Sequence, residues 1–167
     1  MTSPEIRRIR ADEWPELRDL RLAALRDTPL AFGSTYEREL AFADDRWQRW
    51  AADAASGAEY IAVVAAAQRW VAMGRGSADL DDPRSAFLTA VYVAPDWRRK
   101  GLGSAVSEAV VDWARQHGFE SIRLHVTDWN AAARRVYESL GFEPTGVTEP
   151  LPHDPSVTEG EMRLFLG

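Results

Sequence analysis

Cysteine is absent from this 167-residue sequence, which excludes disulfide bonds, zinc–thiolate sites and thiol nucleophiles. Long apolar stretches are absent as well. The longest run, residues 61–67, is far shorter than the roughly 20 residues that a helix needs to span a bilayer, so we expect no membrane partner. The opening residues, MTSPEIRRIR, lack the apolar core of a signal peptide, and we therefore expect a cytoplasmic protein.

Positive charge is scarce relative to negative charge. The chain has 20 Lys and Arg residues against 26 Asp and Glu residues, which gives a formal net charge of −6 at pH 7. Proteins that bind nucleic acid usually present a basic face to the phosphates, so we expect no nucleic-acid partner. The length, the 46% hydrophobic and 28% charged content, and the lack of any repeat or linker-like stretch predict one globular domain over residues 1–167.

Residues 88–104, which read LTAVYVAPDWRRKGLGS, form the most informative local pattern. Residues 88–93 are apolar and rich in β-branched side chains, and Pro95 ends the run, so we expect a buried strand. Three cations then precede Gly101 and Gly103, and apolar residues recur at helical spacing from Leu102 to Trp113. The first turn of a helix offers free N–H groups and the positive end of its dipole. Glycine lets an anion approach that backbone closely. The stretch therefore predicts an anion-binding turn.

Two well-known phosphate motifs do not fit this turn. The dinucleotide fingerprint G-x-G-x-x-G/A would begin at Gly101, but its last position is Val106, which is too large for close helix–strand packing. A P-loop needs its lysine after the first glycine, whereas Lys100 precedes both glycines here.

The stretch resembles instead the Q/R-x-x-G-x-G/A signature of the GNAT N-acetyltransferase superfamily, read here as Arg98-x-x-Gly101-x-Gly103. A second segment strengthens the resemblance. Residues 130–142, NAAARRVYESLGF, are similar to the family's N-x-x-A-x-x-x-Y-E-x-x-G-F helix at every defining position. The resemblance covers the second half of the chain well and the first half only in outline.

The resemblance implies an α/β fold of the GNAT acyl-CoA N-acyltransferase type, with a central mixed sheet splayed between its fourth and fifth strands and flanked by helices. The pattern of apolar residues fits the corresponding order β-α-α-β-β-β-α-β-α-β-β. The expected strands are residues 5–10, 60–67, 70–78, 88–93, 121–127, 142–147 and 161–166. The expected helices begin near residues 12, 44, 102 and 130, and Gln68-Arg69 and residues 149–155 are expected to form a turn and a loop.

The resemblance also implies acetyl-CoA as a cosubstrate, and no metal. Main-chain N–H groups of the glycine turn would hold its pyrophosphate, and the edge of the fourth strand would pair with its pantetheine amides. Asn130 would bond the pantetheine or a phosphate, or simply cap its helix. Without the second segment, the basic turn reads equally well as a solvated surface loop. The implied cofactor-binding residues are Val91, Tyr92, Val93, Arg98, Arg99, Lys100, Gly101, Leu102, Gly103, Ser104 and Asn130.

Tyr137 matches the family's tyrosine general acid, which protonates the departing CoA thiolate. Its helical stripe, shared with Ala133, Val136 and Leu140, also fits a tyrosine of the core. A main-chain N–H near Val91 or Tyr92 would stabilise the oxyanion, because a splayed strand has no neighbour there to bond.

The general base is less well defined by the sequence. His125 occupies the fifth-strand position that carries a glutamate in relatives resembling the ribosomal-protein N-terminal acetyltransferases. A histidine suits proton transfer at neutral pH, although a hydrogen-bonded histidine of the sheet fits the pattern as well. Glu37 and Asp128 are further candidates.

The acceptor implied by the resemblance is a primary amine of a small molecule or peptide, bound by the first half of the chain and the last hairpin. Trp47 and Trp50 would line a wall of that site or belong to the core. Two other functions stay open: a non-catalytic acyl-CoA-binding module, and an acyltransferase with a hydroxyl acceptor or a longer acyl donor. A homodimer is a family-level expectation only.

Overall fold

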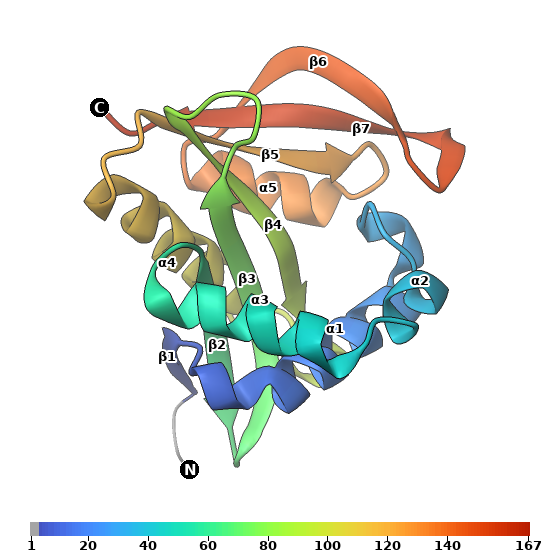
Figure 1. The fold of residues 1–167 in the computed structure, drawn as a ribbon. Coiled ribbons are helices and arrows are strands. Elements are labelled where there is room, and N and C mark those ends of the chain that lie inside the picture. The colour runs from blue at the N-terminus through green and yellow to red at the C-terminus, as the bar shows by residue number, and fades with distance from the viewer. Residues whose placement is uncertain (1–3) are drawn as a thin grey trace.

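The computed structural model describes residues 4–167 and places seven strands in one mixed sheet, in the order β1-β2-β3-β4-β5-β7-β6 (Figure 1). The strands are β1 (Glu5–Arg8), β2 (Tyr60–Ala66), β3 (Arg69–Ala78), β4 (Ser85–Val93), β5 (Ser121–Thr127), β6 (Glu143–Leu151) and β7 (Asp154–Phe165). The helices are α1 (Trp14–Asp27), α2 (Tyr36–Leu40), α3 (Asp44–Ser56), α4 (Leu102–Gln116) and α5 (Ala131–Ser139). Short 3-10 turns are η1 (Ala11–Glu13), η2 (Pro29–Ala31) and η3 (Pro95–Trp97).

The sheet opens in its middle. Strands β4 and β5 run parallel but pair only from Ser85–Ser121 to Phe87–Arg123, near the start of each strand. Beyond that point they diverge, and Figure 1 shows β5, β7 and β6 crossing above the lower half of the sheet. Within residues 4–167, the edge of β4 from Leu88 onward therefore has no strand partner on the β5 side, as the family resemblance implied.

Helices cover both faces of the lower half of the sheet. Helix α4 packs on β2, β3 and β4, and α1 and α3 pack on the opposite side of β2 and β3. Gly76 of β3 allows the close approach of α4. A Cβ atom there would lie 2.7 Å from a methyl group of Val110 and 2.9 Å from the ring of Trp113. A further core cluster, around Leu124, Phe142 and Met162, joins β5, β7 and α5 of the upper half to β4 and α4.

Some element boundaries differ from those predicted from the sequence. The expected loop at 149–155 is largely strand, because β6 extends to Leu151 and β7 begins at Asp154. Prolines at 150, 152 and 155 made this hairpin hard to recognise in the sequence. Pro150 lies on the edge strand β6, Pro152 lies in the turn, and Pro155 lies in the part of β7 that precedes its pairing with β5, so each position tolerates a proline. The β2–β3 turn is made by Ala67 and Gln68, whose φ angles are 52° and 64°, not by Gln68 and Arg69. The short helix α2 was not predicted.

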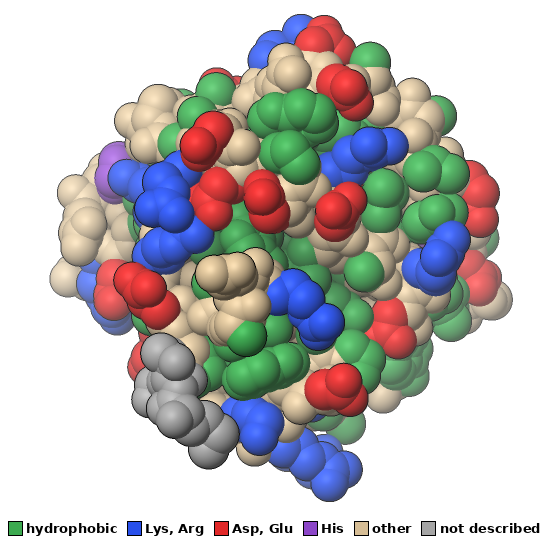
Figure 2. Space-filling view, turned by 90° about the horizontal axis from the view of Figure 1, so that it is seen from below, with side chains coloured by type: hydrophobic (Ala, Val, Ile, Leu, Met, Phe, Trp, Pro, Cys, Tyr) green, Lys and Arg blue, Asp and Glu red, His purple; other side chains and the backbone are tan. Residues whose placement is uncertain are grey.

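Acidic and basic side chains are interspersed with apolar ones on the face seen in Figure 2.

Within residues 4–167, none of the helices combines the length and the apolar character that a membrane span requires.

Candidate active site

A cavity of about 590 Å³ occupies the opening between β4 and β5. Its wall is built from the free part of β4, the turn before α4, the end of β5, the first turns of α5 and the link after α1. Segments from both halves of the sequence therefore meet around one cavity. Cavities of this size, with apolar walls and a few converging polar groups, are typical of small-molecule sites.

The glycine turn forms one end of this cavity. Gly101 has a φ of +79° and directly precedes α4, and Arg99 also has a left-handed backbone, with a φ of +63°. The N–H of Ala105 donates to the carbonyl of Gly101 at 3.0 Å, so the N–H groups of residues 102–104 lie in the first turn, where the helix supplies no acceptor. The sequence-based prediction of an anion-binding turn thus has the required local geometry.

Strand β4 carries a bulge where it borders the cavity. Arg75 of β3 lies opposite Thr89 and Met73 lies opposite Tyr92, so one extra residue is inserted in β4 between those pairs. Ala90 takes the strained conformation, with a φ of +56°. Bulges re-aim the neighbouring main-chain groups, and this one lies beside Val91, where an oxyanion donor is expected.

The side chain of Arg98 is not a free, solvated cation, because it makes two hydrogen bonds within the protein. Its Nη2 donates to the Asp27 carboxylate at 2.6 Å and its Nε donates to the carbonyl of Val93 at 3.0 Å. The hydroxyl of Tyr92 donates to the same Asp27 oxygen at 2.9 Å. Burial, reinforced by that carboxylate, raises the pKa of Tyr92 to about 12. One carboxylate at the end of α1 thus anchors both β4 and the glycine turn.

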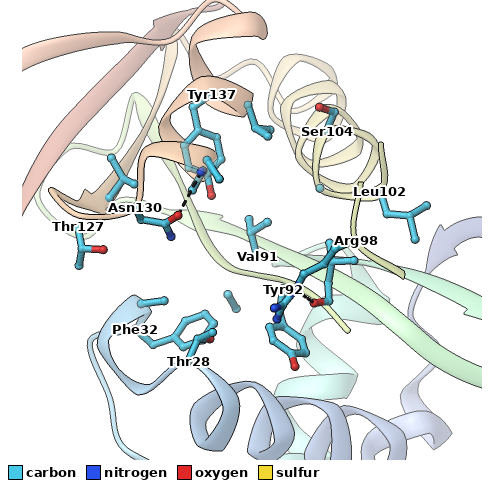
Figure 3. Close-up of a pocket in the computed structure, with 18 of the residues that line it drawn as sticks. Thr28, Phe32, Val91, Tyr92, Arg98, Leu102, Ser104, Thr127, Asn130 and Tyr137 are labelled. Atoms are coloured by element: carbon cyan, nitrogen blue, oxygen red, sulfur yellow. Dashed lines mark hydrogen bonds between the residues drawn. The ribbon is translucent and has the colours of Figure 1, made fainter. Parts of the chain in front are cut away.

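Asn130 and Tyr137 project from α5 on the opposite wall (Figure 3). The side chain of Asn130 caps the helix by accepting a hydrogen bond of 3.2 Å from the N–H of Ala133, which leaves its amide NH₂ group for a ligand. Tyr137 is 8% exposed and packs against Phe142 in the core, yet its hydroxyl end faces the cavity. Burial raises the pKa of Tyr137. The two interpretations of this tyrosine, core residue and cavity residue, are therefore compatible.

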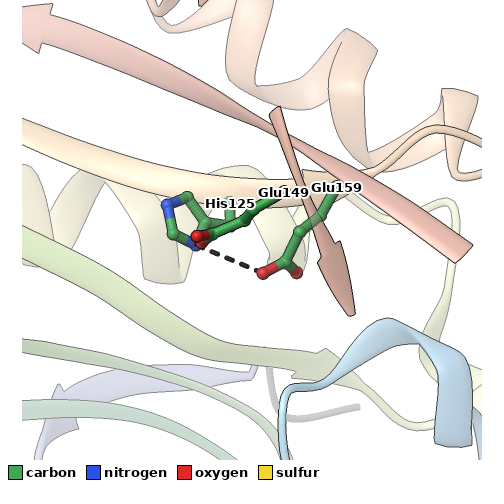
Figure 4. A group of neighbouring side chains, drawn as sticks. All are labelled: His125, Glu149 and Glu159. Carbon is green, nitrogen blue, oxygen red and sulfur yellow. Dashed lines mark ion pairs between the residues drawn. The ribbon is translucent and has the colours of Figure 1, made fainter. Parts of the chain in front are cut away.

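His125 lies in the middle of a polar cluster on β5, β6 and β7 (Figure 4). Its Nδ1 is 3.1 Å from a carboxylate oxygen of Glu149 and 3.3 Å from one of Glu159, and its Nε2 is 3.3 Å from Nη1 of Arg123. The hydrogen bond to Glu159 raises the pKa of His125 above its ordinary value of 6.5, although burial opposes the effect. Glu159 dominates because its side chain is 12% exposed, against 50% for Glu149.

A second, smaller cavity of about 260 Å³ adjoins the first one. The two share wall residues that include Phe32, Thr89 and His125. The β6–β7 turn closes over this side, because His153 Nε2 lies 2.7 Å from the carbonyl oxygen of Phe32. Trp50 lines the smaller cavity and stacks on Trp47, which is fully buried in the core.

Nearly all of the residues expected from the sequence meet at the larger cavity. All the implied cofactor-binding residues except Lys100 line it, together with Tyr137 and His125. Glu37 and Asp128 line neither cavity: Glu37 is exposed on α2, and Asp128 pairs with Arg134 at 3.6 Å. Sequence reasoning missed Asp27, Glu149 and Glu159, because each pairs with residues distant in the chain. It also missed Thr127, which the fold places in the wall of the larger cavity.

The family model described as "Acetyltransferase (GNAT) family" matches residues 6–142. The chain belongs to this family. The match covers both the glycine turn and the α5 segment on which the resemblance was based, and it extends into the first half, where the resemblance was only an outline.

Local matches to curated GNAT-type proteins are short. Thialysine N-epsilon-acetyltransferase of Bos taurus is 38% identical over 60 residues, which are 36% of this chain and 35% of that protein. Ribosomal protein bS18-alanine N-acetyltransferase of Escherichia coli K12 is 44% identical over 57 residues, 34% of this chain and 38% of that protein. The chain thus spans little more than a third of the length of these relatives, and they differ in the acceptor that they name.

Solved structures of the GNAT fold match over almost the whole chain. A putative acetyltransferase from Salmonella typhimurium, determined with its cofactor acetyl-CoA, has a TM-score of 0.81 at 19% identity and covers 99% of this chain and 95% of its own. PaiA N-acetyltransferase from Thermoplasma acidophilum, in complex with coenzyme A, has a TM-score of 0.74 at 15% identity and covers 98% and 100%. At these identities the likeness establishes the fold, and the predicted GNAT architecture is confirmed.

Proposed function

We propose that this protein is an N-acetyltransferase that moves the acetyl group of acetyl-CoA directly to a primary amine. The observation that carries the proposal is the juxtaposition, around one cavity, of the unpartnered edge of β4 and the glycine turn before α4. The first suits an extended chain of amides, and the second suits a pyrophosphate. Acetyl-CoA carries these two groups in series.

In this arrangement the N–H groups of residues 99–104 hold the pyrophosphate, because the N–H of Arg98 already donates to the carbonyl of Pro95 at 3.4 Å. Each charge-assisted hydrogen bond contributes roughly 1.5–3 kcal/mol, so a handful is enough to anchor the cofactor. The edge from Val91 to Val93 pairs with the pantetheine arm, the free amide of Asn130 adds a further hydrogen bond, and the bulged main chain beside Val91 receives the thioester oxygen.

The chemistry requires two protons to leave the acceptor ammonium. His125 takes the first at Nε2, once the hydrogen bond from Arg123 to that nitrogen is released, and passes it to solvent, while Glu159 orients the ring through Nδ1. The neutral amine then attacks the thioester carbon, a C–N bond forms and the C–S bond breaks. Tyr137 donates its hydroxyl proton to the departing thiolate and is reprotonated by the second proton of the former amine. The raised pKa of Tyr137 keeps the hydroxyl protonated at neutral pH until that step.

The test combines a binding and a turnover measurement. Titration calorimetry with coenzyme A should show binding, and a panel of primary amines assayed by thiol release should reveal acetyl transfer. Binding without transfer to any amine would favour a non-catalytic acyl-CoA-binding module. Transfer to alcohols alone would favour a hydroxyl acceptor.

A further inference from the structure

Glu149 and Glu159 differ from the other carboxylates around the two cavities. Within the part of the chain that the structure describes, their ion pairs are made with His125 alone, whereas the remaining carboxylates pair with arginine. The arginine pairs are Asp27–Arg98, Glu39–Arg21, Glu59–Arg75, Asp79–Arg123 and Glu161–Arg123. Among these carboxylates, Glu149 and Glu159 are therefore the two that lack an arginine partner.

The proton of His125 cannot satisfy both of these carboxylates. A guanidinium only donates hydrogen bonds, so Nε2 of His125, 3.3 Å from Nη1 of Arg123, must be the acceptor nitrogen of the neutral ring. The proton then lies on Nδ1, where Glu149 and Glu159 compete for it at 3.1 and 3.3 Å. One negative charge is left without a donor. The same tautomer opposes a metal ion, because a metal would need a bare Nδ1 and a proton on Nε2, facing the arginine.

The polar groups around Glu149 and Glu159 carry further negative charge and do not neutralise these two carboxylates. The connected polar groups on this face of the sheet comprise five carboxylates and two arginines. The carboxylates are Asp79, Asp81, Glu149, Glu159 and Glu161, and the arginines are Arg123 and Arg163. Of these residues, Glu159 lines the smaller cavity, and a net negative field beside a cavity attracts cations and repels anions.

Thr127 provides an independent indication that a polar ligand enters here. It is 2% exposed, lines the larger cavity and lies opposite Glu159 in the β5–β7 register, and its hydroxyl has no hydrogen-bond partner among residues 4–167. Figure 3 shows the side chain at the end of the cavity beyond Asn130. An unpartnered buried hydroxyl is unfavourable, and a ligand amine beside it would supply the missing hydrogen bond.

The carboxylate pair is poorly suited to hold the reacting amine itself. Two negative charges stabilise an ammonium and raise its pKa, whereas the nucleophile must be neutral. The pair is well suited to a second cation that stays charged throughout the reaction. Thr127, which is adjacent on the same face, then receives the reacting amine.

We propose that the acceptor is a diamine-type dication, with one amine beside Thr127 and a second ammonium held by Glu149 and Glu159. The inference deepens the proposed function and rests on it. Both carboxylates meet at Nδ1 of His125, which lies two residues before Thr127 on β5. Residues two apart on a strand are separated by about 6.6 Å, so the two nitrogens are joined by about four or five methylene groups. Glu149 is half exposed, which allows a longer acceptor to extend into solvent.

The test compares α,ω-diamines of three to six methylenes with monoamines of the same length, by thiol release from acetyl-CoA. The wild-type protein should favour a diamine over its matched monoamine by at least about tenfold in kcat/KM, mostly through KM. In Glu149→Gln that ratio should fall several-fold. Glu143→Gln is the control: it makes the same charge change on an exposed residue of the same hairpin and should leave the ratio intact.

The outcomes separate the two proposals. Equal kcat/KM values for diamines and monoamines, with transfer to both, would overturn the dication site and leave the acetyltransferase proposal standing. If no amine of either kind caused thiol release, both proposals would be overturned. Tight binding of Zn²⁺ alone, lost in Glu149→Gln, would overturn the dication site in favour of a metal centre.

Discussion

The hydroxyl of Tyr92, on β4, donates a hydrogen bond of 2.9 Å to Asp27, the last residue of α1. The same carboxylate oxygen accepts from Arg98 at 2.6 Å, and the arginine bond is the main reason why the pKa of Asp27 is lowered. The strand edge proposed to hold pantetheine and the turn proposed to hold pyrophosphate are thus joined by one side chain. Asp27 thereby fixes their relative position.

Asp27→Asn should therefore weaken cofactor binding without unfolding the protein. Both side chains of the pair with Arg98 are more than a third exposed, so solvent screens the interaction and only about 1 kcal/mol is at stake. The expected rise in the Kd for coenzyme A is about two- to fivefold, measured by titration calorimetry, with a change in Tm below about 2 °C. Asp19→Asn, an exposed acid on the same helix, is the control. An unchanged Kd would show that Arg98 does not position the turn.

Tyr137→Phe should lower turnover at least about tenfold, which corresponds to about 1.4 kcal/mol of transition-state stabilisation. The aromatic ring still fills its place beside Phe142, so coenzyme A binding and Tm should remain close to those of the wild type. Tyr60→Phe serves as the control, because Tyr60 lines neither cavity. The measurement is single-turnover acetyl transfer, which isolates the chemical step. Unchanged single-turnover rates would restrict Tyr137 to its packing role.

The cofactor half of the site was predictable because its signals are local. A glycine at 101 with positive φ, a helix that starts at once, and a capping asparagine at 130 are all encoded within a few residues. The separation of β4 from β5 required the family resemblance, because pairing of distant strands leaves no local signature. The bulge at Ala90 was missed for the same reason, since it is defined by its register against β3.

The acceptor half was predictable only at His125. Its partners Glu149 and Glu159 lie 24 and 34 positions further along the chain. They lie on strands whose boundaries are hard to predict from the sequence because of the prolines and Gly160. The last strand predicted from the sequence begins at residue 161, which leaves Glu159 outside it, and Glu149 lies in a predicted loop. Alternation along β7 does bring Glu159 and Glu161 to the face of His125, but this follows only once the register is known.

The raised pKa of His125 predicts the direction of a pH effect. As a base, His125 must be neutral, so kcat/KM should rise with pH around a midpoint above 6.5. Glu159→Gln removes the main cause of the raised pKa and should move the midpoint to lower pH. The pH–rate profile measures this, and titration of the His125 ring signals by NMR assigns the group. Glu143→Gln should leave the midpoint in place, and a midpoint equally unmoved in Glu159→Gln would assign the base to another group.

The contact between Gly76 and α4 predicts a stability effect that is separate from the chemistry. An added Cβ would meet Val110 at 2.7 Å and Trp113 at 2.9 Å, closer than packed carbon atoms normally come. Both neighbours are buried, so α4 must shift, and Gly76→Ala should lower the free energy of unfolding by about 1–3 kcal/mol. Gly160→Ala, on β7, has no atom within 4 Å of the new Cβ and should change stability by less than about 0.5 kcal/mol. Urea unfolding followed by tryptophan fluorescence measures both, and equal stabilities of the two variants would contradict the tight packing of α4 on β3.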